Sequence, residues 1–153
     1  MELIHVQNLT KRFDELTAVD NINFSIHEGE IFGFLGPNGA GKTTTLSILS
    51  TLLSQTSGEA YVNGYNVKTE QNKVRRSIGV VFQDPTLDEE LTARENMFIH
   101  GKLYGMKNPG EKTDKLLALV ELEDWKNKLV KTFSGGMKRR LEIARGLLHE
   151  PKI

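Results

Sequence analysis

The sequence contains no cysteine, which excludes disulfide bonds and thiolate metal sites. It has no apolar run long enough to cross a bilayer, and its first residues show a strand pattern without the apolar core of a signal peptide. Basic and acidic side chains balance at 20 each, so no overall charge draws the chain to nucleic acid or to an anionic membrane. These absences favour a reducing cytosol and predict no nucleic-acid partner.

Two kinds of strand pattern are present in a chain whose 153 residues, 38% of them hydrophobic, suit a single domain. Apolar and polar residues alternate around residues 4–6 and 22–26, as in half-buried antiparallel strands. Residues 58–67 read as a strand pair around an Asn-Gly turn. The nearly continuous apolar runs at 31–35 and 78–82 favour strands of a buried parallel sheet.

From about residue 91 the apolar period changes to near 3.6, which predicts helices in the rest of the chain. One helix is expected over residues 93–104. A second would start with Asn108 as cap, Pro109 in the first turn and Glu111 as the acid of a capping box. A third would follow Ser134, with an apolar stripe facing the core.

The pattern G-x-x-x-x-G-K-[ST] is complete between the run at 31–35 and a helix with an apolar face. Its backbone N–H groups, together with the helix start, are suited to phosphate oxygens. Lys42 would oppose the outer phosphates and Thr43 would hold a magnesium ion. The alternative is an ordinary glycine-rich turn. The pattern predicts a nucleoside triphosphate site formed by Gly36, Pro37, Asn38, Gly39, Ala40, Gly41, Lys42, Thr43 and Thr44.

A second glycine-rich helix start follows at Ser134, Gly135 and Gly136. A serine cap followed by two glycines offers several N–H donors and a hydroxyl to an anion, although an ordinary N-cap is the alternative. One domain does not need two such sites for one triphosphate. A head-to-tail pair of domains would use both sites, with each nucleotide held between one partner's Lys42 loop and the other partner's Ser134 helix.

The stretch from Phe133 to Leu141 resembles the signature sequence of the ATP-binding cassette (ABC) family, and the resemblance extends over the whole chain. It implies ATP and Mg²⁺ as ligands. It also implies that Gln83 is the family's Q-loop glutamine, which is catalytic with Lys42 and contacts the metal with Thr43, and that Phe13 stacks on adenine. Without the family, Gln83 is a polar residue that ends a strand, and Phe13 is a loop residue packed on the core.

Other nucleotide-binding classes fit less well. The stretch 127–130 lacks the aspartate of the Asn-Lys-x-Asp guanine reader, so a GTPase is not favoured. The two motifs lie too close in sequence for the long coiled coils of chromosome-maintenance ATPases. The residues at 51–64 and 137–141 are most similar to ATPases of drug, antibiotic or lipid exporters related to daunorubicin resistance.

The family resemblance implies an apolar strand after the signature helix that ends in aspartate and glutamate, and residues 151–153 stand where it would begin. We therefore expect residues 1–153 to bind ATP weakly and hydrolyse it negligibly, whereas the complete protein would be an ATPase. The expected fold is α/β: a P-loop NTPase three-layer core, incomplete at the C-terminus, with two subdomains. The boundaries expected are 1–30 and 57–68 for the β subdomain, 31–56 and 69–86 for the P-loop core, and 87–150 for the helical subdomain.

The resemblance implies an ATP-binding subunit that couples ATP binding and hydrolysis to export through a separate integral membrane permease. Its other partner would be a second copy of itself or a paralogous ATPase. The subunit would lie in the cytoplasm at the inner face of the cell membrane, held there by the permease. The alternatives are a soluble ABC-type ATPase of translation or repair, and a fragment that binds nucleotide without hydrolysis.

Overall fold

The computed structural model describes every residue from Met1 to Ile153. The chain forms two compact units, one of residues 1–78 with 152–153 and the other of residues 79–151. We call them the sheet unit and the helical unit.

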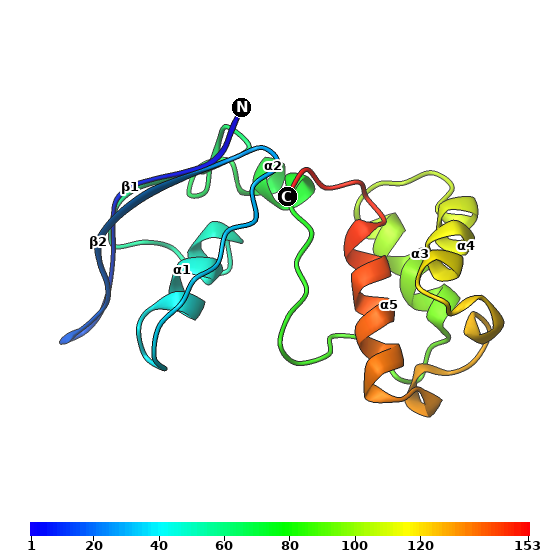
Figure 1. Ribbon diagram of the computed structural model, residues 1–153. Coiled ribbons are helices and arrows are strands. Elements are labelled where there is room, and N and C mark those ends of the chain that lie inside the picture. The colour runs from blue at the N-terminus through cyan, green and yellow to red at the C-terminus, as the bar shows by residue number, and fades with distance from the viewer. The chain divides into compact units, whose positions relative to one another are not determined.

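A four-stranded antiparallel sheet with the order β2-β1-β3-β4 dominates the sheet unit (Figure 1). Its strands are β1 (Glu2–Phe13), β2 (Leu16–His27), β3 (Ser57–Val62) and β4 (Tyr65–Asn66). Ile4 pairs with Ile26 on one side and with Val62 on the other, so apolar residues line up across three strands. The antiparallel strands and the hairpin predicted from the sequence are confirmed.

Two short helices, α1 (Lys42–Leu49) and α2 (Gln71–Ser77), contact strands of this sheet. They bury Ile48, Leu49 and Val74 against its apolar residues. The buried core of the unit consists of Ile4, Val6, Leu9, Ile48, Leu49, Ala60, Val62, Val67, Val74 and Ile78. This core holds α1, and therefore the loop before it, against the sheet.

The predicted parallel strands at 31–35 and 78–82 are wrong, because neither run has strand structure. Ile31 and Leu35 are almost fully exposed, at 104% and 96%. A parallel strand needs a neighbour to complete its ladder of hydrogen bonds, and no strand of residues 1–153 pairs with either run. The α/β class is confirmed, whereas the parallel layer of the predicted three-layer core is not formed by these residues.

The helical unit packs α3 (Ala93–Leu103), α4 (Gly110–Leu119) and α5 (Gly135–Leu147) against one another (Figure 1). The short 3₁₀ helices η1 (Glu123–Trp125) and η2 (Val130–Thr132) lie between α4 and α5 in the chain. The predicted helices are thus confirmed. Their shared core consists of Ala93, Met97, Leu117, Leu122, Val130, Phe133, Leu141, Ala144 and Leu148.

The predicted cap of α4 is wrong. Pro109, not Asn108, is the N-cap residue, and no side chain caps this helix. Pro109 is buried and packs closely on α3. A Cβ added to Gly101 of α3 would lie 2.6 Å from the Cβ of Pro109. Glu111 instead pairs with Lys115 at 2.6 Å. The packing of Pro109 therefore sets where α4 begins. A capping box does occur at α3, between Thr92 and Glu95.

Three aromatic rings meet in the helical unit. The ring of His100 lies 4.7 Å from that of Tyr104, which stacks on His149 at 3.9 Å between centroids. Burial is the main cause that lowers the pKa of His100 from 6.5 to about 4, with smaller electrostatic contributions from Arg145 and His149. His100 is therefore neutral in the folded protein throughout the neutral pH range.

We expect the free energy of unfolding to fall as pH drops from 6.5 toward 4, because in this range the unfolded chain binds a proton at His100 and the folded chain does not. Above pH 6.5 this contribution is complete. Urea unfolding at several pH values measures how steeply the free energy of unfolding changes with pH. His100→Gln should flatten the dependence of the unfolding free energy on pH between pH 5 and pH 6.5. Equal slopes in wild type and His100→Gln would disprove this assignment.

Candidate nucleotide-binding site

The loop before α1 is built on glycines with positive φ. Gly36, Gly39 and Gly41 have φ of 149°, 84° and 82°, a range in which a residue with a side chain would be strained. Gly41 is the N-cap residue of α1 and adopts the left-handed conformation. The loop therefore turns sharply into the helix, the geometry that a phosphate-binding loop requires.

Gly41 is also where the loop approaches β2 most closely. A Cβ at this position would lie 2.3 Å from the backbone oxygen of Ala18, too close for any side chain. A Cβ at Gly39 would meet no atom within 4 Å. Gly41 is thus required by packing as well as by its positive φ, whereas Gly39 is required by its positive φ alone.

The start of α1 is free of the groups that usually occupy a helix N-terminus. No side chain caps it and its first turn contains no acidic residue. Thr45 points its hydroxyl back to the Gly41 carbonyl, 2.9 Å away. The N–H groups of the first turn and the partial positive charge of the helix end are therefore available to an anion.

Lys42 adds a full charge to this site. Its ammonium group donates hydrogen bonds to the carbonyl oxygens of Gly36 at 2.7 Å and Pro37 at 2.6 Å. The lysine is thus folded across the loop, where a phosphate oxygen could replace either neutral carbonyl with a charge-assisted bond. Thr43 is exposed, and Thr44 is partly buried.

A pocket of about 460 Å³ adjoins the loop, within the size range of small-molecule sites. Loop residues and β2 line it together, with polar groups from Asp20, Lys42 and Thr45 and apolar walls from Val19 and Phe34. Sequence reasoning missed the contribution of β2, because no motif there indicates that its residues face the loop.

The predicted adenine-stacking residue, Phe13, ends β1 and is 43% exposed. The ammonium group of Lys11 lies over its ring, 4.8 Å from the centroid. Phe13 is not among the residues that line the pocket beside the loop. Its role at adenine stays a prediction.

The second predicted phosphate site lies at the start of α5. Ser134 is its N-cap residue, and its hydroxyl oxygen accepts a hydrogen bond from the Met137 N–H at 3.2 Å. A Cβ added at Gly135 would meet no atom within 4 Å, and one at Gly136 would reach only the Ser134 hydroxyl at 4.0 Å. Packing within the chain therefore does not require these glycines, and their role in binding phosphate stays a prediction.

Gln83 is exposed and lies in the helical unit with Ser134, whereas Lys42 and Thr43 belong to the sheet unit. The predicted metal contacts of Thr43 and Gln83 therefore stay predictions. Elsewhere, no group of three or more His, Cys, Asp or Glu side chains could hold a metal ion.

The glycine loop with its lysine, followed by α1, defines a P-loop nucleotide-binding protein. The family model described as ABC transporter matches residues 19–153, so the chain belongs to this family. None of the helices has the length and hydropathy that a membrane crossing requires.

Curated relatives include two proteins concerned with antibiotics. The chain is 40% identical over 153 residues to the linearmycin resistance ATP-binding protein LnrL of Bacillus subtilis, covering 99% of this chain and 49% of that protein. It is 41% identical over 151 residues to the bacitracin transport ATP-binding protein BcrA of Bacillus licheniformis, with the same coverage. The chain thus spans about half the length of these relatives.

Solved structures of the family are also similar. The ATP-binding subunit of an ABC transporter superposes with a TM-score of 0.87 at 28% identity, covering 97% of this chain and 63% of that one. The cassette MJ0796, in a dimeric post-hydrolysis state bound to ADP and Pi, gives 0.83 at 32% identity, covering 97% and 71%.

Proposed function

We propose that this chain is the nucleotide-binding part of an ABC ATP-binding subunit that drives export of a drug-like or lipid substrate through a separate membrane permease. The observation that carries the proposal is the loop from Gly36 to Thr43, where positive-φ glycines, an uncapped helix start and a folded-back lysine converge. The names of LnrL and BcrA support an antibiotic-related substrate, and they do not favour a soluble ATPase of translation or repair.

Each part of the loop has a defined task in this proposal. The N–H groups of the loop and of the first turn of α1 bind the phosphate oxygens, and Lys42 exchanges its loop carbonyls for the outer phosphates. The hydroxyl of Thr43 and the amide of Gln83 would hold Mg²⁺, which supplies charge neutralisation between the phosphates. Gln83 would also orient the attacking water.

The functional assembly would be a head-to-tail dimer, with a second copy or a paralogous ATPase. The dimeric state of MJ0796 supports this arrangement. In it, Ser134, Gly135 and Gly136 of one subunit would bind the phosphates held by the other subunit's loop. The permease would hold the pair at the inner face of the membrane, and the surface of residues 86–104 is the candidate contact.

We expect Lys42→Ala to weaken ATP binding about 10- to 100-fold, because it removes a charge-assisted contact with the phosphates. Equilibrium titration with a fluorescent ATP analogue and Mg²⁺ measures this. Lys68→Ala, at an exposed lysine of the same unit, should bind like wild type. Phosphate release should stay near background in all samples of residues 1–153.

Full ATP affinity in Lys42→Ala would refute the proposed site. Turnover of several ATP molecules per second by residues 1–153 would refute the expectation that these residues alone hydrolyse ATP negligibly.

A further inference from the structure

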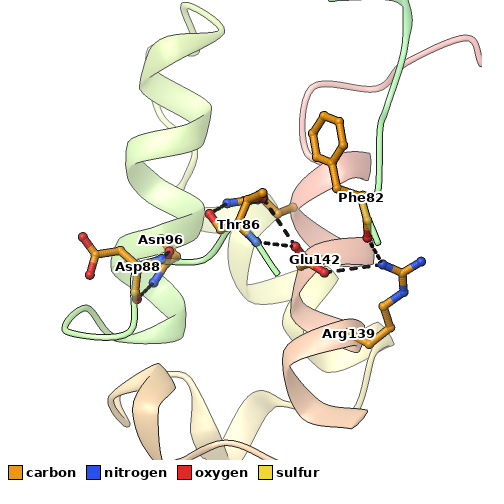
Figure 2. Close-up of polar contacts among 7 residues, drawn as sticks. Phe82, Thr86, Asp88, Asn96, Arg139 and Glu142 are labelled. Atoms are coloured by element: carbon orange, nitrogen blue, oxygen red, sulfur yellow. Dashed lines mark hydrogen bonds and ion pairs between the residues drawn. The ribbon is translucent and has the colours of Figure 1, made fainter. Parts of the chain in front are cut away.

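The segment from Phe82 to Thr86, which contains Gln83, is fastened at both ends to α5 (Figure 2). The guanidinium of Arg139 donates to the Phe82 carbonyl. The Thr86 N–H donates to the Glu142 carboxylate at 2.8 Å. The segment contains neither helix nor strand, so these side chains supply the bonds that regular structure would otherwise provide.

Glu142 lies at the centre of this arrangement. Its side chain is only 2% exposed, and it pairs with Arg139 at 3.5 Å and with Arg145 at 3.9 Å. Arg145 in turn donates to the Thr86 carbonyl at 2.9 Å and bonds its hydroxyl. Three side chains spaced three residues apart on α5 thus act together on two backbone positions of the segment. We call Arg139, Glu142 and Arg145 the clamp.

A buried carboxylate paired with two arginines is a costly way to fasten a loop, because desolvation of Glu142 offsets much of the attraction between the charges. Apolar side chains would give comparable stability, but they would not fix individual backbone groups. The clamp, by contrast, holds one carbonyl at residue 82 and both backbone groups at residue 86. Gln83 lies between these points with its own side chain exposed.

The segment is also tied to α3 just beyond Thr86. Asp88 and Asn96 exchange two hydrogen bonds of 2.9 Å, from the Asp88 N–H to the amide oxygen and from the amide nitrogen to the Asp88 carbonyl. The Asn96 side chain is buried and also donates to Thr92 (Figure 2 draws the pair with Asp88). The chain from 82 to 88 is therefore anchored to α5 and then to α3.

We propose that Arg139, Glu142 and Arg145 are positioning residues that hold Gln83 fixed relative to α5, so that Gln83 and the Ser134 helix start move as one body. This rests on the proposed function, in which Gln83 serves one nucleotide of the dimer and Ser134 the other. A shift of α5 toward the partner's ATP would then carry Gln83 with it.

A spin label at residue 83 tests the clamp without any nucleotide. Because the chain has no cysteine, Gln83→Cys can be labelled at a single position. In the otherwise native chain we expect an immobilised nitroxide spectrum. Arg139→Ala and Glu142→Gln, each added to the labelled chain, should shorten the rotational correlation time by at least about threefold. Arg139→Lys should restore much of the order, because its ammonium can still donate to the Phe82 carbonyl.

Arg140→Ala is the matched control for Arg139→Ala. Arg140 is the next residue of α5, but it bonds to Val120 and Glu121 and not to the segment. We expect its labelled spectrum to stay immobilised. Thermal unfolding identifies variants that have lost their fold. If Glu142→Gln does not fold, Arg139→Ala decides the test, because the Arg139 side chain is half exposed.

Unchanged spectra in folded Arg139→Ala and Glu142→Gln would overturn the proposal that the clamp holds Gln83. A label as mobile in the Arg140→Ala control as in Arg139→Ala would overturn it too. The proposed function is judged separately by the ATP affinity of Lys42→Ala. The clamp and the proposed function can therefore fail independently, and the two failures are distinguishable.

Discussion

Replacing Gly41 by alanine should lower ATP affinity by more than about 100-fold and destabilise the sheet unit by several kcal/mol. The new Cβ would lie 2.3 Å from the Ala18 carbonyl oxygen, so either the loop or β2 has to move. The residue would also keep a φ of 82°, which strains any side chain. Because the N–H groups of the loop would bind phosphate only when they converge, displacement of Gly41 should remove several of the proposed contacts together.

Gly39→Ala is the matched control, because its φ of 84° imposes the same strain while its Cβ meets no atom within 4 Å. We expect it to cost only about 1 to 2 kcal/mol. Thermal unfolding and titration with a fluorescent ATP analogue compare the two variants. Equal losses in both would show that strain, and not the approach to β2, determines the requirement for glycine.

Leu141→Ala should destabilise the helical unit by about 3 kcal/mol, through lost burial and the cavity left behind. Leu141 is fully buried in the core shared by the three helices. Leu147→Ala, on the same helix at a residue 43% exposed, should cost less than about 1 kcal/mol. Urea unfolding followed by the fluorescence of Trp125, the single tryptophan, reports on this unit.

The result matters for function because α5 carries both the Ser134 cap and the clamp. A loosened α5 should also release the label at residue 83 in the Leu141→Ala variant. Similar urea midpoints for Leu141→Ala and Leu147→Ala would contradict the packing described for α5.

Features with a local cause could be predicted from the sequence. The β3-β4 hairpin follows from an Asn-Gly turn whose residues have φ of 51° and 77°, and the loop before α1 follows from a continuous motif. Features that depend on distant partners could not. The runs at 31–35 and 78–82 have the composition of buried strands, but a strand also requires a neighbour, which composition does not reveal.

The short helix α2 escaped prediction because it spans only seven mostly polar residues, of which Val74 and Ser77 are buried. The clamp escaped for a different reason. Arg139 bonds to a carbonyl 57 positions earlier in the chain, and no local sequence pattern indicates such a distant partner. The only signal available was an acid flanked by two arginines at helical spacing.

The two ends of the helical unit meet. A Cβ at Gly79 would lie 2.9 Å from the ring of Pro151, and the N–H groups of Lys152 and Ile153 both donate to the Ser77 carbonyl, at 2.8 and 3.1 Å. The chain therefore leaves and re-enters the sheet unit at one place, as in a module inserted into a host domain. Residues can be gained or lost between 79 and 151 without stretching the host, so the inserted segment can diverge in sequence while the loop before α1 stays unchanged.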